Sequence, residues 1–125
     1  MFDHVGFNVS DFEKSLLFYK AVLAPLELGV LHQGEGWAML GGPNGRLWIG
    51  AFGAPATPIH LAFRAATRAQ VKAFYSAALA AGGRDNGAPD LRPQYAPDYF
   101  AAFVLDPDGH NVEAVTTVAE AANSA

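Results

Sequence analysis

The feature that most constrains this sequence is an internal repeat. Residues 60–80 align with residues 4–24 without a gap, at a constant offset of 56 positions. The identical pairs in this alignment are His4 with His60, Phe7 with Phe63, Phe18 with Phe74, Tyr19 with Tyr75, Ala21 with Ala77, Leu23 with Leu79 and Ala24 with Ala80. A repeat of this kind indicates that one supersecondary unit is used twice. The first histidines of the two segments therefore occupy equivalent places and are the first candidates for function.

Composition restricts the class of protein. The chain has 125 residues, of which 51% are hydrophobic and 16% are charged, as expected for one folded core. Its formal net charge is −4 and it has no basic block, which argues against nucleic-acid and anionic-membrane partners. The absence of cysteine excludes disulfides, thiolate nucleophiles and cysteine-ligated metals. No secretory signal or membrane-spanning apolar stretch is visible, so we expect a cytoplasmic protein.

In the first half, hydrophobic alternation predicts a strand from residue 2 to residue 9. Its apolar side would carry Val5 and Phe7, and its other side His4 and Asn8. A capping box with Ser10 at its start predicts a helix that ends before the proline at position 25. Three short strands are then expected, at Leu26–Leu31, Gly36–Leu40 and Arg46–Phe52.

The second half repeats this plan. The strand at 59–65 would place Leu61 and Phe63 on its apolar side, and His60 and Arg64 on the other. A second capping box predicts a helix, which a glycine pair ends. The expected remainder is a weak strand with a long loop at Asp85–Pro97, a strand at Tyr99–Leu105, a turn at Asp106–Gly109 and a last strand at His110–Thr116.

We therefore predict an α+β protein made of two βαβββ modules. The modules, residues 1–53 and 58–116, would form one domain of residues 1–125, with 117–125 as a fraying tail. Their strands would build a curved mixed sheet around a cavity, with the helices on the outer face. A small chain with unpaired sheet edges is expected to cover them by forming a homodimer.

The turns give a second internal alignment. Matching residues 42–45 to 106–109 places Ile49 opposite Glu113. Alternation then places Trp48 on the helix side of its strand, where core packing is expected. His32 and His110 lie beside turns, and we expect both to be exposed.

Three side chains are candidates for a metal site. Glu113 lies in an otherwise apolar strand, where a carboxylate is costly unless it is paired or bound to a cation. With His4 and His60, it supplies two imidazoles and one carboxylate, a set that holds a divalent metal and leaves positions open for substrate. The alternative is that the histidines are hydrogen-bonded core residues and the carboxylate pairs with one of them or with an arginine.

Other candidates lie around the inferred cavity. Arg92, Tyr95 and Tyr99 lie in or beside the long second-half loop, which is suited to act as a lid. The arginine would take an anionic group, and the tyrosines would provide aromatic contact or a proton. Asn8 and Arg64 share the faces of the two candidate histidines and are suited to orient a ligand. The alternative is a solvated loop whose tyrosines pack on the sheet edge.

The chain resembles the vicinal oxygen chelate superfamily, which includes glyoxalase I, bleomycin-resistance proteins, fosfomycin-resistance transferases and extradiol dioxygenases. The segments that carry the resemblance are Asp3–Gly6 with Phe18–Tyr19, Ile59–Phe63 and Leu105–Glu113. The resemblance implies a divalent metal, such as Fe, Mn, Ni, Co or Zn, held by His4, His60 and Glu113. Glyoxalase I has a fourth ligand at the place of Ile49. An isoleucine cannot ligate a metal, so Ile49 is expected to contact substrate instead.

Three functions remain open from the sequence. The first is a metal-dependent enzyme of the glyoxalase or dioxygenase kind, acting on a small oxygenated substrate, with Glu113 and Tyr99 as catalytic candidates. The second is a metal-free protein that sequesters a small molecule, as bleomycin-resistance proteins do. The third is a structural dimer module with inert histidines. The predicted triad favours the enzyme, whereas the missing fourth ligand favours the binding protein.

Overall fold

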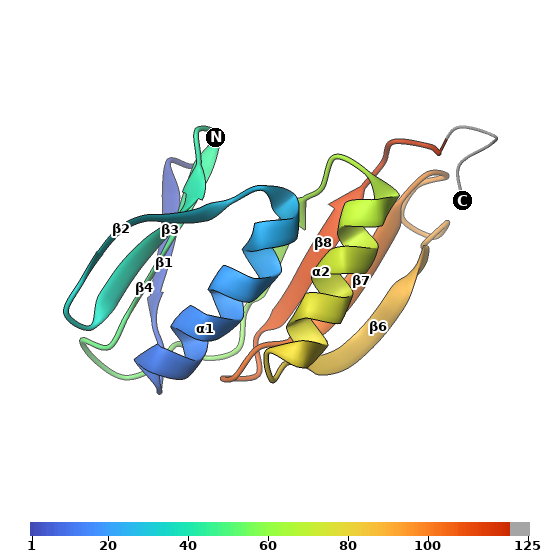
Figure 1. The fold of residues 1–125 in the computed structure, drawn as a ribbon. Coiled ribbons are helices and arrows are strands. Elements are labelled where there is room, and N and C mark those ends of the chain that lie inside the picture. The colour runs from blue at the N-terminus through green and yellow to red at the C-terminus, as the bar shows by residue number, and fades with distance from the viewer. Residues whose placement is uncertain (121–125) are drawn as a thin grey trace.

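A computed structural model describes residues 1–120, and the end of the predicted tail, residues 121–125, lies outside this description. The chain forms two successive modules of the same plan (Figure 1). The first consists of β1 (His4–Asn8), α1 (Phe12–Leu23), the 3₁₀ helix η1 (Ala24–Leu26), β2 (Gly29–Gly34), β3 (Trp37–Gly42) and β4 (Gly45–Gly50). The second consists of β5 (His60–Arg64), α2 (Arg68–Ala80), β6 (Arg84–Leu91), β7 (Phe100–Leu105) and β8 (Asn111–Thr116).

Each module has its own four-stranded mixed sheet. The strand orders are β1-β4-β3-β2 and β5-β8-β7-β6, with the first strand of each module parallel to the last. In Figure 1, α1 and α2 lie next to each other on the same side of the two sheets, and the two helices pack together. The predicted class, α+β with paired βαβββ modules, is therefore confirmed.

Within residues 1–120, no helix is both long and apolar enough to cross a membrane.

The core lies between the helices and the sheets. The repeat partners Phe18 and Phe74 are both fully buried and occupy matching places on α1 and α2. Opposite them, the sheet faces that look towards the helices carry apolar side chains such as Phe7, Val112 and Ala114. Because side chains alternate along a strand, the remaining residues of each sheet point to the other face, where polar groups are found.

The two helices begin differently. Thr67 caps α2 as predicted, because its Oγ1 accepts a hydrogen bond from the backbone N–H of Gln70 at 3.1 Å. In α1 the predicted cap is wrong. Asp11 fills that role and accepts from the N–H of Lys14 at 3.2 Å. Ser10 instead donates hydrogen bonds across to the other module, as described next.

The turn at 106–109 joins the second module to the first. The carboxylate of Asp108 accepts from the backbone N–H and the hydroxyl of Ser10. The buried carboxylate of Asp106 accepts from the hydroxyl of Tyr19 at 2.6 Å, and also from two backbone N–H groups of its own turn. Burial, and then the negative charge of Asp106, raises the pKa of Tyr19, so its hydroxyl stays protonated and donates. Both aspartates of the turn therefore bind the first module.

His110, which the sequence predicted to be exposed, is fully buried. Its Nδ1 accepts a hydrogen bond from the backbone N–H of Ile59 at 3.0 Å, and its ring packs edge-on against Phe7 of the first module. The turn is tied inward by Asp106, so the residue that follows it enters the core instead of the solvent.

Candidate functional site

Glu113 and His60 meet on the face of the second sheet that points away from the helices. In the parallel pairing of β5 with β8, Ala62 lies opposite Glu113, which puts His60 and Glu113 on one face. Glu113 Oε1 lies 2.7 Å from His60 Nε2, and Oε2 accepts a hydrogen bond from the hydroxyl of Tyr99 at 2.5 Å. The carboxylate is 1% exposed, so a buried anion is held between an imidazole and a phenol. We refer to these three side chains as the His60–Glu113–Tyr99 cluster.

The phenol of Tyr99 is a proton donor in this cluster. Burial raises its pKa to about 12, and the hydrogen bond to Glu113 and the charge of that carboxylate act in the same direction. At neutral pH the phenol is therefore protonated and donates to the carboxylate. This arrangement partly offsets the cost of burying the anion.

The raised pKa of Tyr99 has a measurable consequence at alkaline pH. An unfolded tyrosine titrates near pH 10, so stability from the protonated phenol is present below about pH 10 and is lost as pH rises to about 12. We expect Tyr99→Phe to remove one ionisation near pH 12 from the tyrosinate absorbance titration. The free energy of unfolding of this variant should also fall less steeply between about pH 10 and pH 12. Glu113→Gln should move that step to lower pH. A titration that Tyr99→Phe leaves unchanged above pH 10 would contradict the assignment.

The other loop candidates gather around this cluster. The guanidinium of Arg92 lies 5.3 Å from the ring centroid of Phe103, and its Nη2 donates to the carbonyl of Ala88 at 2.6 Å. Phe103 lies directly opposite Glu113 on the neighbouring strand. The exposed ring of Tyr95 packs edge-on against Tyr99 at 5.2 Å. Arg92 and Tyr95 of this loop therefore contact Phe103 and Tyr99, the two side chains next to Glu113, and a role of the loop as a lid stays a prediction.

The face of the first sheet that points away from the helices carries the second candidate histidine. His4 is half exposed, and its Nδ1 lies 2.9 Å from Oδ1 of Asp3, whose other oxygen is 3.8 Å from Arg46. The hydrogen bond from His4, and then the charge of Arg46, lowers the pKa of Asp3. An ionised carboxylate only accepts, so the proton of neutral His4 lies on Nδ1 and its Nε2 has a free lone pair.

Trp48, not Ile49, lies at the place equivalent to Glu113. In the first sheet Gly6 is opposite Trp48 and Phe7 is opposite Ile49, whereas in the second sheet Ala62 is opposite Glu113. Residues 43–44 connect the paired ends of β3 and β4, whereas residues 106–110 connect those of β7 and β8. Matching residues 42–45 to 106–109 ignores this odd difference, and it misaligns the last strand by one residue. A shift of one residue exchanges the two faces of a strand. Ile49 is consequently fully buried in the core, away from the predicted substrate face.

The predicted ligands fall into two groups within one chain. The residues described contain no cluster of three or more His, Cys, Asp or Glu side chains able to hold a metal. His60 and Glu113 lie together on the second sheet, whereas His4 lies on the first sheet with Asn8 and Trp48. Arg64 follows His60 and Ala62 on the same face of β5 and is exposed.

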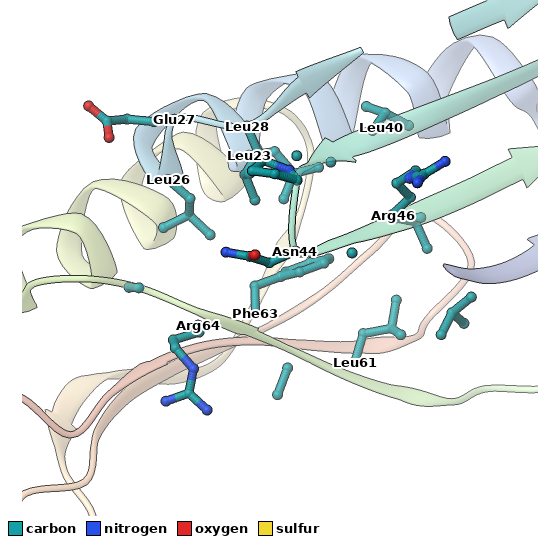
Figure 2. A pocket seen from close by; sticks show the side chains of 18 of the residues that line it. Leu23, Leu26, Glu27, Leu28, Leu40, Asn44, Arg46, Leu61, Phe63 and Arg64 are labelled. Carbon is teal, nitrogen blue, oxygen red and sulfur yellow. The ribbon is translucent and has the colours of Figure 1, made fainter. Parts of the chain in front are cut away.

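A large apolar cleft lies elsewhere, between the modules. It measures about 960 Å³, and its lining includes His4 but neither His60 nor Glu113. Figure 2 shows leucines from the end of α1 and from β3 on one wall, and Leu61 and Phe63 of β5 on the other. These apolar walls belong to the helix-facing sides of the strands, so the cleft is separate from the buried carboxylate.

Comparison with known proteins agrees with the fold. A family model, described as the Glyoxalase/Bleomycin resistance protein/Dioxygenase superfamily, matches residues 1–114. A glyoxalase/bleomycin resistance protein from Albidiferax ferrireducens T118 is 32% identical, with a TM-score of 0.83 over 92% of this chain and 98% of that one.

More distant structures share the fold alone. A glyoxalase/bleomycin resistance protein/dioxygenase family enzyme from Burkholderia phytofirmans PsJN is 16% identical, with a TM-score of 0.74 over 93% of this chain and 98% of that one. Lactoylglutathione lyase from Agrobacterium tumefaciens is 14% identical, with a TM-score of 0.68 over 92% of each chain. No curated protein sequence matches this chain. The match along residues 1–114 and the 32% identity over nearly the whole chain establish that this protein belongs to the Glyoxalase/Bleomycin resistance protein/Dioxygenase superfamily.

Proposed function

We propose that this protein is a metal-dependent enzyme of the glyoxalase or dioxygenase kind that acts on a small oxygenated substrate. Its ligands would be His60 and Glu113 of one chain and His4 of a second copy. The observation that carries this proposal is the buried carboxylate of Glu113, which lies 2.7 Å from an imidazole nitrogen on an otherwise solvent-facing side of the sheet. An imidazole nitrogen and a carboxylate oxygen side by side are two of the three protein ligands of an open divalent metal site.

The donor set fits a divalent first-row metal. Imidazole nitrogen suits Zn, Fe, Ni and Co, and carboxylate oxygen suits Mn as well. Metal-binding histidines usually donate the N–H of their other ring nitrogen to a carboxylate, which fixes the tautomer. His4 has such a partner in Asp3, which accepts from Nδ1 and leaves the Nε2 lone pair for a metal. When bound, such a metal supplies Lewis acidity that polarises a substrate oxygen.

Two observations support a site shared between copies. Within one chain only two of the three proposed ligands meet. In addition, β1 and β5, which carry the two histidines, are edge strands that pair on one side only. Pairing the first module of one copy with the second module of another would cover these edges and give two equal sites around a twofold axis.

The neighbouring side chains are given supporting roles. Tyr99, protonated up to about pH 12, would donate a proton to a substrate oxygen or orient Glu113. Arg92 lies over Phe103 next to the carboxylate and would bind an anionic group of the substrate. Asn8 and Arg64 would contact the rest of the substrate from the two sheets.

A complementation experiment tests the shared site. His4→Ala and His60→Ala proteins, each with a different histidine-free affinity tag, are co-refolded, and the heterodimer is purified through both tags. We expect each variant alone to retain no Mn, Fe, Ni, Co or Zn. The heterodimer should regain one intact site and thus half the wild-type metal per chain. A heterodimer without metal would show that the ligands belong to one chain, and a wild-type protein that retains no metal would overturn the metal itself.

A specific observation favours a metal-free binding protein as the second candidate. Trp48 lies at the place equivalent to Glu113, so a paired site would have an indole where a fourth ligand is expected. The hydrogen bond between His60 and Glu113 also satisfies both groups without a metal. In that case small-molecule binding persists in protein from which all metal has been removed.

A further inference from the structure

We infer that His110 is a positioning residue, whose buried imidazole fixes the beginning of β5 and so holds His60 against Glu113. The inference rests on the proposed function only where it treats His60 and Glu113 as metal ligands, because the contacts that carry it are present without a metal. It assigns a role to a polar side chain of the core that neither the metal site nor the apolar cleft uses.

His110 lies at the point where the two strands with proposed ligands begin. It directly precedes β8, which carries Glu113. Its Nδ1 accepts a hydrogen bond at 3.0 Å from the backbone N–H of Ile59, the residue before His60. The carbonyl of Ile59 in turn accepts from the backbone N–H of Asn111 at 2.9 Å. Both backbone groups of Ile59 are therefore bound at the start of β8, one by a side chain and one by the main chain.

The beginning of β5 needs such a support because this strand lies at an edge of its sheet. In the part of the chain that the structure describes, β5 pairs with β8 alone. Strand ends with few contacts open locally at a low free energy. His60 is the first residue of β5, and its imidazole is half exposed, so its 2.7 Å contact with Glu113 depends on this end of the strand staying paired.

The first module lacks the side-chain support. Aligning the two parallel strand pairs by their candidate histidines places Gly45 at the position of His110. Asp3 then takes the position of Ile59, and the main-chain bond is repeated, because its carbonyl accepts from the N–H of Arg46 at 3.2 Å. A glycine has no side chain that could accept a second bond. The additional bond therefore belongs to the module that carries two of the three proposed ligands.

The imidazole is held from both modules. Its ring packs edge-on against Phe7 of β1, with a centroid distance of 4.9 Å and an interplanar angle of 64°. The backbone N–H of His110 donates to Oδ1 of Asp106 at 2.8 Å, and its carbonyl accepts from the N–H of the same aspartate at 3.0 Å. A side chain fixed in this way is a rigid support for a ligand strand, as functional sites require of the residues behind their ligands.

Packing alone does not account for an imidazole at this position. Because Nδ1 accepts a hydrogen bond, the proton of the neutral ring lies on Nε2. Nε2 is buried and makes no hydrogen bond to any of residues 1–120, and an unpaired buried donor is destabilising. A phenylalanine would fill the space without such a donor. The bond from Ile59 to Nδ1 is therefore the contact that distinguishes histidine from an apolar residue here.

The test compares two substitutions that separate the ring from the acceptor. His110→Phe keeps an aromatic ring next to Phe7 but cannot accept, whereas His110→Asn loses the ring and keeps an acceptor oxygen near the place of Nδ1. In metal-free protein, we expect His110→Phe to accelerate hydrogen exchange at the amide of Ile59 and at Nε2 of His60, both measured by NMR. Its Mn²⁺ affinity, measured by equilibrium dialysis, should fall about 10-fold or more. His110→Asn should keep both properties close to wild type, although loss of the ring lowers its melting temperature further.

This order distinguishes positioning from a role in stability alone, for which metal affinity would follow the melting temperature and asparagine would be the worse substitution. Ile59→Pro removes the donor instead of the acceptor, at the start of an edge strand where proline is tolerated. It should accelerate exchange at Nε2 of His60 as His110→Phe does. His32→Phe, at an exposed position on β2, is the matched control and should change neither exchange nor affinity.

The outcomes separate this inference from the proposed function. Wild-type protein that binds no Mn²⁺ would overturn the metal site, and the exchange measurements would still decide the role of His110. Fast exchange at His60 in His110→Phe, restored to the wild-type rate in His110→Asn, would support the inference with or without a metal. Wild-type exchange at His60 in both His110→Phe and Ile59→Pro, or an affinity that follows the melting temperature, would overturn it while leaving the metal site standing.

Discussion

Replacing Asp106 with alanine is expected to lower the free energy of unfolding by about 3–5 kcal/mol. Its carboxylate is 1% exposed and accepts hydrogen bonds from the hydroxyl of Tyr19 and from the backbone N–H groups of Asp108 and His110, at 2.6, 2.9 and 2.8 Å. The substitution leaves two buried donors and one partly buried donor without an acceptor. It also removes a contact between the two modules, so both should be destabilised together. Urea denaturation at neutral pH measures the change.

Graded variants test whether the loss comes from these hydrogen bonds. Tyr19→Phe removes one donor from the carboxylate and should cost about 1.5–3 kcal/mol. Ser10→Ala removes the more exposed contact to Asp108 and should cost less than about 1 kcal/mol. Asp90→Asn, at an exposed position on β6, is the control for loss of one negative charge. A loss below about 1 kcal/mol for Asp106→Ala would show that the turn is held by packing alone.

Replacing Glu113 with glutamine is expected to lower the affinity for a divalent metal on the order of 100-fold or more. The amide keeps the size of the side chain and an oxygen that accepts from Tyr99, so the fold should survive. It removes the buried negative charge next to His60, which supplies most of the attraction for a cation. Equilibrium dialysis with Mn²⁺ or Co²⁺ measures affinity, and the metal-induced rise in the melting temperature reports it independently.

Two comparisons make the Glu113 result specific. Tyr99→Phe removes a hydrogen bond to the carboxylate without removing the charge, so affinity should fall about 10-fold. Asp90→Asn alters the net charge by the same amount as Glu113→Gln, at an exposed place two strands away in the same sheet, and should leave affinity unchanged. Wild-type metal affinity in Glu113→Gln would exclude this carboxylate as a ligand and leave the metal-free binding function as the better account.

The sequence predicted most of the fold because strand alternation and helix caps depend on residues that are close together in the chain. Alternating apolar residues predicted every strand that carries a candidate ligand, and the Thr67 cap and the glycine pair after α2 predicted the limits of that helix. The predicted start of α1 failed because two polar residues compete for it. Asp11 takes the cap while Ser10 is drawn to Asp108 in the other module, a contact that spans 98 positions.

The faces of the strands were harder to predict, because a strand has a period of two. The turn before β8 has five residues between the paired strand ends, against two before β4, and this odd difference exchanged the predicted roles of Trp48 and Ile49. Gly50 was the available signal for the true face of Trp48. It lies two positions later on the same face of the strand, where any side chain would collide with the indole. The burial of His110 was also missed. Its backbone N–H donates to Asp106, which is itself buried against the first module, and no neighbouring residue in the sequence indicates this contact.

The sequence alone determined the two-module architecture, the apolar core and the identity of the candidate ligands, because these follow from periodicity and from residue chemistry. Tertiary structure decided which of the candidates meet. It placed Glu113 against His60 and Tyr99, put His4 on a different sheet with Asp3, and brought Trp48 and Phe52 together on the first sheet. Such meetings depend on strand register and on how the modules pack, and both are set by contacts between residues far apart in the chain.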